Sequence, residues 1–338
     1  MTHHSTTRRR MLAAAGAGLA AGYLPRVFAD DYPSKNIHVV VPTRQGGGAE
    51  RLARSFDDFW SKRLKTHFEY SFYPGAAGQV GYELFVHKKD PDAYNLLFGN
   101  MGPEMIMYAL RHPDYRFPQD YQYFCRMDVD DSVVFVSRKS RFQKIEDLAA
   151  EAKKRTVNVS VSRLPHPASI GVLALGKAIN GKFNLVPYGG GNPTQIAVMN
   201  GEVDAGALPL AGVVALKDQL KILTVFNDDF QLGSYTDNSP PVNKVFGTRI
   251  PDLPSSRSWA IHAQAIDKYP ERFALLEKTS REVFQDPAYK QAYKKTGAPV
   301  ETLQYGDKAV CTKYANAMVE LANEYRTLLT GKGGKAKK

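Results

Sequence analysis

The chain has 338 residues, which is enough for two domains with cores of their own, and its 43% hydrophobic and 23% charged residues are typical of a globular protein. The formal net charge is +11, but residues 1–29 carry four arginines and no acid, and residues 331–338 carry four lysines. Eight of the eleven net positive charges therefore lie at the two ends. This distribution argues against a nucleic-acid partner, because it leaves the body of the chain with little excess charge.

The N-terminus is predicted to be an export signal. Residues 7–12 (TRRRML) match a twin-arginine signal, and the apolar run that follows is too short to span a bilayer. Small residues at Val27 and Ala29 suit a signal peptidase, so residues 1–29 are predicted to be removed. An ordinary secretory signal with chance arginines is the alternative. At the other end, residues 331–338 are interpreted as a basic flexible tail.

In the first part of the chain, strands and helices are predicted to alternate. Short apolar runs with β-branched residues predict buried strands, and apolar residues three or four apart predict helices. This order favours parallel strands joined by right-handed crossovers. The predicted strands are 37–41, 68–72 and 95–99, with helices at 50–64 and 80–86.

The rest of the chain repeats the alternation and then becomes helical. Residues 227–256 are rich in Asp, Asn, Ser and Pro and are predicted to be irregular. Strands are predicted at 132–137, 156–162, 183–186, 202–208 and 221–226, and helices at 144–155, 168–180, 193–200, 270–285, 287–296 and 307–329.

Two glycine triplets occupy matching places in the two halves of this pattern. Residues 46–48 follow the first strand, residues 189–191 follow the strand at 183–186, and each triplet precedes a predicted helix. A glycine loop that enters a helix presents backbone N–H groups beside the positive end of the helix dipole, which favours an anion. Two such loops predict an anion held between two lobes.

Six short motifs occur in the same order and at similar spacing as in a known family. They are 32–42 (YPSKNIHVVVP) with the glycines at 46–48, 74–78 (PGAAG), 92–100 (DAYNLLFGN), 186–189 (VPYG), 200–204 (NGEVD), and 286–289 (DPAY) before 297–299 (GAP). Their order and spacing resemble the Bug family, the substrate-binding receptors of tripartite tricarboxylate transporters. The resemblance covers residues 32 to about 325.

The resemblance implies an α/β fold of two Rossmann-like lobes with a central cleft and a hinge, the type II periplasmic binding protein or "Venus flytrap". Lobe one would comprise 32–128 plus 252–330, and lobe two 129–251. In the family, the glycine loops of both lobes clasp a carboxylate of a small organic acid. Carried onto this chain, the implied ligand-binding residues are Thr43, Arg44, Gln45, Gly46, Gly47 and Gly48 in the first loop, Tyr188, Gly189, Gly190, Gly191, Asn192, Pro193 and Thr194 in the second, and Asn100, Ser162 and Ser169 around the cleft.

Several residues near these loops depart from the family pattern. Arg44 and Gln45 stand where small residues or proline are usual, and Arg163 and His166 are additions after the strand at 156–162. If the arginines face the cleft, the ligand should carry more than one carboxylate, because a guanidinium holds a carboxylate in a bidentate pair. The alternative is that either arginine points to solvent, and the sequence leaves this open.

The resulting interpretation is a periplasmic receptor, not an enzyme. It would capture a di- or tricarboxylate or an aromatic acid and deliver it to membrane transporter subunits of the tripartite tricarboxylate type, as a monomer, with no cofactor and no metal. One alternative is a receptor that presents its ligand to a membrane sensor kinase, and another is a periplasmic enzyme on the same fold. Loss of uptake on deletion would favour transport.

Other signals are weaker. Residues 171–178 approach a phosphate-binding loop but lack the Ser or Thr that holds magnesium, and the histidines show no metal spacing. Trp259 is interpreted either as a core residue or as a cleft contact. Cys125 and Cys311 are interpreted either as free thiols or as a disulfide pair, since their spacing decides neither.

Overall fold

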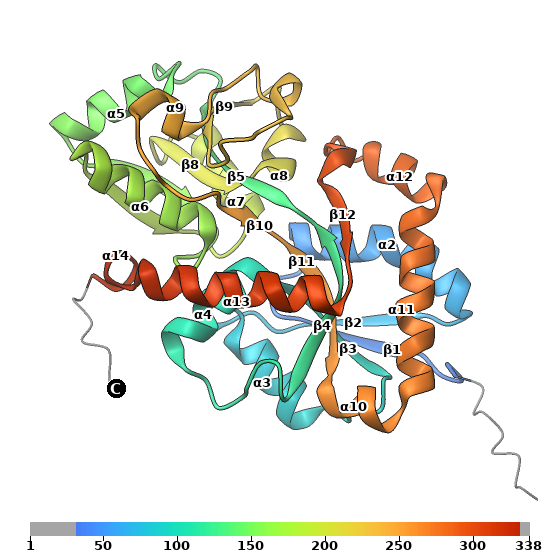
Figure 1. The fold of residues 1–338 in the computed structure, drawn as a ribbon. Coiled ribbons are helices and arrows are strands. Elements are labelled where there is room, and N and C mark those ends of the chain that lie inside the picture. The colour runs from blue at the N-terminus through green and yellow to red at the C-terminus, as the bar shows by residue number, and fades with distance from the viewer. Residues whose placement is uncertain (1–31, 332–338) are drawn as a thin grey trace, which may run out of the picture.

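The computed structural model describes residues 32–331, which form two α/β lobes (Figure 1). The predicted signal at 1–29 and residues 332–338 of the tail lie outside the described residues. Each lobe is built on a six-stranded sheet. The first sheet has the strand order β12-β4-β11-β3-β1-β2, and the second has β10-β5-β8-β6-β7 with β9 paired to β5. The predicted two-lobed α/β class is confirmed.

The first sheet begins with the predicted βαβαβ unit. β1 (Ile37–Val41) pairs in parallel with β2 (Phe68–Phe72) and β3 (Asn95–Asn100), and α2 (Gly48–Leu64) and α3 (Gln79–Lys88) make the crossovers. The sequence analysis missed the next elements, a helix and three antiparallel strands. These are α4 (Met101–Arg111), β4 (Tyr121–Asp128), β11 (Arg257–His262) and β12 (Leu303–Gly306), and a short 3-10 turn, η1 (Ala76–Gly78), precedes α3.

An aromatic core fixes α2 and the C-terminal helices on one face of this sheet. Trp60 and Trp259 are fully buried with their ring centroids 5.0 Å apart, and the indole N–H of Trp60 donates to the Thr279 hydroxyl at 2.8 Å. Trp259 therefore belongs to the core and not to the cleft, which decides between the two interpretations of this residue. The helices that cover this core are α10 (Ala263–Lys268), α11 (Pro270–Gln285) and α12 (Pro287–Lys294).

The second lobe repeats the alternation around a mixed sheet. β6 pairs in parallel with β7 and β8, while β5 runs antiparallel to β8, β9 and β10. The strand predicted at 202–208 begins later than expected, because residues 201–204 form turns. The stretch 227–256, which was predicted to be irregular, includes short helical turns and a short strand. The bounds are β5 (Asp130–Ser137), α5 (Ile145–Lys154), β6 (Val157–Val161), α6 (Pro167–Ile179), β7 (Phe183–Pro187), α7 (Gly191–Met199), β8 (Ala205–Pro209), α8 (Leu210–Val214), β9 (Leu220–Val225), η2 (Gly233–Tyr235), α9 (Val242–Phe246) and β10 (Pro254–Ser255).

The chain crosses between the two sheets twice, where β4 leads into β5 and where β10 leads into β11. Because β10 pairs with β5 of the second sheet, although its residues fall in the predicted first lobe, the lobe boundaries remain a prediction. The turn η3 (Val300–Thr302) precedes β12, and α13 (Lys308–Glu324) and α14 (Arg326–Thr330) end the described chain.

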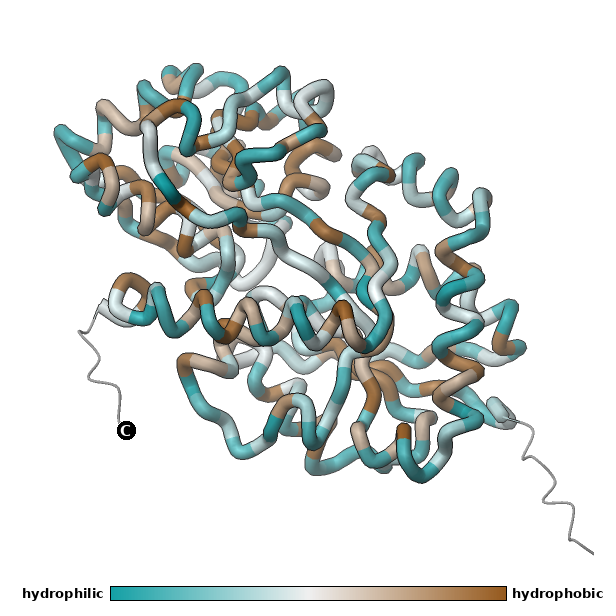
Figure 2. Tube along the Cα trace, viewed as in Figure 1, coloured by the Kyte–Doolittle hydropathy of each residue, from teal (hydrophilic) through white to brown (hydrophobic). Residues whose placement is uncertain are grey.

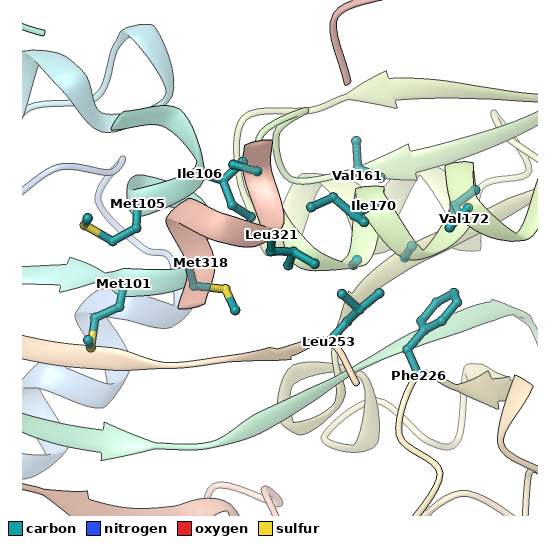
Figure 3. Packing of buried hydrophobic residues seen from close by; sticks show 14 of the residues in the cluster. Met101, Met105, Ile106, Val161, Ile170, Val172, Phe226, Leu253, Met318 and Leu321 are labelled. Atoms are coloured by element: carbon teal, nitrogen blue, oxygen red, sulfur yellow. The ribbon is translucent and has the colours of Figure 1, made fainter. Parts of the chain in front are cut away.

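The helix α13 supports both lobes. Figure 2 shows hydrophobic and hydrophilic residues alternating along it, as expected for a helix with one face on a core. Figure 3 shows Met318 and Leu321 between side chains of α4, such as Ile106, and side chains of α6, such as Ile170. The C-terminal helix thus joins the cores of the two lobes through apolar contact.

Both cysteines are buried free thiols, so the disulfide interpretation is wrong. Burial raises the pKa of Cys311 to about 11. Across residues 32–331, no helix has the length and apolar character needed to cross a membrane.

Candidate functional site

A cavity of about 310 Å³ lies between the lobes, and both glycine loops line it. All the predicted site residues except three border this cavity. Ser169 and Thr194 are buried behind it, where their hydroxyls donate to the carbonyl oxygens of Arg163 (3.0 Å) and Gly190 (2.7 Å). Tyr188 borders a neighbouring hollow instead. The structure brings the predicted loops together, and ligand contact by each residue remains a prediction.

The first loop joins β1 to the N-terminus of α2. Gly46 has φ +80°, a conformation that favours glycine, and the Glu50 carboxylate accepts the Gly46 N–H at 2.6 Å. Glu50 thereby braces the loop from the first turn of the helix. The loop lies at the N-terminus of the 17-residue helix α2. This is the positive end of the helix dipole, where an anion is favoured.

The second loop joins β7 to α7. Gly189 has φ +77°, and its N–H donates to the Ser162 carbonyl at 2.9 Å, which ties the loop to the residue after β6. Gly190 is the N-cap of α7. The carboxyl ends of β6 and β7 therefore place this loop at the edge of its sheet, where α/β proteins commonly bind ligands.

The two loops contact each other directly across one side of the cavity. The Asn192 side-chain amide donates to the Gly46 carbonyl at 3.0 Å, and Arg51 donates to the same carbonyl at 3.0 Å. Arg51 also donates to the Asn192 amide oxygen at 3.3 Å. These bonds join residues from separate sheets, so the structure has the lobes closed on the cavity.

The charged residues that line the cavity are three arginines, and no carboxylate is among the lining residues. Arg44 makes no recorded hydrogen bond or ion pair with any described residue. Arg163 is largely buried and donates to the Ala77 carbonyl at 3.1 Å, with the Glu104 carboxylate 3.5 Å away. The third arginine, Arg257, was missed by the sequence analysis. The other lining residues not predicted are Ala49, Pro103, His166, Leu208, Pro209 and Ser255.

Arg257 lies with Asp128 and Asp130 at the two crossings between the sheets. Its guanidinium contacts the Asp128 carboxylate, its backbone N–H donates to the same carboxylate at 2.6 Å, and Asp130 lies 3.6 Å from it. Both aspartates are fully buried. Burial raises the pKa of Asp130 to about 7, although Arg257 opposes the shift. This cluster fixes the two crossing segments to each other beneath the cavity.

His166 is the N-cap of α6, and its Nδ1 accepts the Ala168 N–H at 3.0 Å. Burial, together with the charges of Arg163 and Arg257, lowers its pKa to about 3. The imidazole is therefore neutral at ordinary pH and serves as a helix cap. The sequence analysis noted His166 only as an addition to the family pattern and did not indicate this role.

Glu104 is a buried carboxylate behind the cavity, and it was also missed. It stands in the first turn of α4, accepts the Tyr82 hydroxyl at 2.7 Å, and has Arg163 from the opposite lobe as its counter-charge. Tyr82 in turn shares a hydrogen bond with Tyr123. Burial raises the pKa of Glu104 to about 7, and the attraction of Arg163 limits the shift.

This raised pKa gives a testable pH dependence. The folded protein holds the Glu104 proton more tightly than an unfolded chain, whose ordinary value is 4.5, so stability from this group is present below about pH 4.5 and is lost as the pH rises to about 7. We expect Glu104→Gln to lack this loss, which amounts to a difference of about 3 kcal/mol between the two pH profiles, because each pKa unit is worth about 1.4 kcal/mol. Urea unfolding of both proteins at about pH 4.5 and pH 8 measures it, and parallel profiles would contradict it.

The described part of the chain holds no group of three or more His, Cys, Asp or Glu residues placed to bind a metal ion. The arrangement is instead a cavity between the two lobes that is bordered by two glycine loops, the N-termini of α2 and α7, and arginine side chains. Such a site binds an anion by hydrogen bonds and charge.

Comparison of the sequence with known proteins gives relatives that are named as UPF0065 or Bug proteins. No family model matches the chain. An Agrobacterium vitis protein of the UPF0065 group is 30% identical over 193 residues, a match that spans 55% of this chain and 55% of that relative. Protein BugT of Bordetella pertussis is 23% identical over 297 residues, which cover 86% of this chain and 89% of BugT.

Comparison of the fold gives solved structures that cover nearly the whole chain. An R. palustris protein with adipate superposes with a TM-score of 0.77 at 17% identity, over 88% of this chain and 98% of that structure. MatC from Rhodopseudomonas palustris with bound malate gives 0.74 at 18% identity, over 88% and 100%. A TctC solute-binding protein from Polaromonas gives 0.63 at 20% identity, over 89% and 100%. The two-lobed fold is thus that of solute-binding proteins.

Proposed function

We propose, from the membership of this chain in the Bug family of tripartite tricarboxylate transporter receptors, that it is a periplasmic receptor for a small organic acid. The observation that carries the proposal is the cavity between the lobes, which glycine loops from both sheets border. One carboxylate of the ligand is bound by the backbone N–H groups of these loops. Closure of the lobes buries it, and the ligand favours the closed state because it binds that state better.

The lining of the cavity supports an acid with more than one carboxylate and an apolar middle. Arg44 has no recorded partner in residues 32–331 and is available to a second carboxylate. Leu208, Pro209 and Pro103 supply apolar walls for the carbon skeleton. The solved structures with malate and adipate hold dicarboxylates on the same fold, which is consistent with this class.

The partner of the closed form is a membrane transporter of the tripartite tricarboxylate type. This step rests on the family, whereas export by the twin-arginine route rests on the motif at residues 7–12, and the monomeric state is part of the same proposal. Presentation of the ligand to a sensor kinase is the second candidate. A deletion strain that loses uptake of the acid supports transport, and one that loses only gene induction supports sensing.

A thermal-denaturation screen of organic acids tests the proposed function. We expect at least one di- or tricarboxylate to raise the melting temperature without being consumed, since a ligand at 100 times its Kd stabilises a protein by about 2.7 kcal/mol. Amides or esters of the same acids serve as the control, because they lack the negative charge. If no carboxylate stabilises the protein, the proposal is overturned, and if product accumulates, an enzyme is indicated instead.

A further inference from the structure

A second hollow adjoins the central cavity. Its volume is about 540 Å³, and we call it the outer hollow. It has one wall in common with the cavity between the glycine loops. That shared wall is made of Thr43, Arg44, Ser162, Arg163 and Gly189.

The charge of the outer hollow is positive. Its lining includes Arg44, Arg111 and Arg163, and no carboxylate is among its lining residues. Arg163 has the Glu104 carboxyl group 3.5 Å away as its partner. Arg44 and Arg111 have no ion pair with any residue of the described chain, so their charges are available to an anion. Arg111 is exposed at the C-terminal end of α4 and does not border the central cavity.

The remaining walls of the outer hollow are largely apolar, and they come from both lobes. The first lobe supplies Pro42, Pro74 and Ala77, and the second supplies Leu164, Pro165 and Pro187. Leu164 is 41% exposed and presents an apolar side chain to this hollow. An apolar hollow that adjoins the central cavity and has an uncompensated arginine outside that cavity fits an elongated acid with a charge at its far end.

We propose that the outer hollow is a subsite for the distal carboxylate of an elongated dicarboxylic acid, with Arg111 as the group that binds it. The inference rests on the proposed function, because the proximal carboxylate lies at the glycine loops. The carbon chain passes Arg44 and Arg163 and lies against the proline and leucine walls. Arg111 then selects acids by length: a short diacid ends before reaching it, and a monocarboxylate has no charge to offer it.

Isothermal titration of a straight-chain series tests this selection. The ligands are succinate, adipate, suberate and sebacate, with octanoate as a monocarboxylate of suberate's length. We expect Arg111→Ala to weaken binding of the longest diacids about three- to tenfold and to leave succinate and octanoate unchanged, because a partly exposed ion pair is lost only for ligands that reach it. Arg249→Ala is the matched control, since Arg249 is also exposed but borders neither hollow.

The outcomes separate the two proposals. A loss confined to the long diacids, and reduced by added salt, supports the subsite. Equal weakening of every acid overturns it, because that result indicates general attraction by positive charge. Unchanged affinities for all acids in Arg111→Ala also overturn it while leaving the proposed function in place. Failure of the wild-type protein to bind any acid of the series and the wider screen overturns the proposed function itself.

Discussion

Replacement of Arg257 by alanine is expected to lower the free energy of unfolding of the ligand-free protein by about 3–5 kcal/mol, because it leaves the buried carboxylates Asp128 and Asp130 without their positive partner. The guanidinium is only 15% exposed and both aspartates are fully buried, so the three charges are largely shielded from water in the folded protein. The change also removes the contact that joins the two crossings between the sheets. Chemical unfolding followed by circular dichroism measures the loss.

A second variant separates lost charge balance from lost packing. In the triple variant Asp128→Asn, Asp130→Asn and Arg257→Met, no buried charge is left over, while each asparagine oxygen still accepts the backbone N–H of residue 257 or Ala211. We expect this variant to recover part of the stability, because no charge is left buried without a partner, while the asparagine NH2 groups that face the methionine lack acceptors. A cost of less than about 1 kcal/mol for Arg257→Ala alone would contradict the account.

The parts of the site that could be predicted from the sequence are those that local rules determine. A glycine triplet between a buried strand and a helix implies a loop at a sheet edge, and both triplets occupy such loops on one cavity. The sequence also shows Arg44 beside the first triplet. The sequence does not show which way the Arg44 side chain points. The structure places Arg44 on the wall shared by the two hollows.

The residues that were missed owe their position to contacts between distant segments. Arg257 reaches Asp128 because two chain crossings, 129 residues apart in sequence, lie side by side at the hinge. Glu104 lies in α4, where glycine and proline in the first turn (MGPEM) hide the helical pattern, and its counter-charge Arg163 comes from the other lobe. Neither pairing follows from periodicity or spacing. A buried carboxylate becomes visible only when the fold shows what surrounds it.

The same reasoning predicts which side chain sets the affinity for a second carboxylate. Arg44 borders the cavity with no recorded partner in the described chain, so the proposed ligand is its natural counter-charge. Arg44 is exposed, and we expect a short dicarboxylate such as succinate to cover it. Arg44→Ala should then weaken binding of that acid by about 2 kcal/mol or more, roughly 30-fold in Kd, because a charge pair that the ligand desolvates is lost. Isothermal titration of the purified protein measures this change.

Two controls make the Arg44 prediction specific to bidentate charge recognition. Arg44→Lys keeps the charge but loses the planar fork, so it should recover only part of the affinity. A monocarboxylate of equal chain length should bind wild type and Arg44→Ala alike, since its single carboxylate is held by the glycine loops. An unchanged Kd for the dicarboxylate in Arg44→Ala would show that the guanidinium faces solvent when the ligand is bound. In that case the specificity of the cleft for diacids would have to come from the backbone of the loops alone.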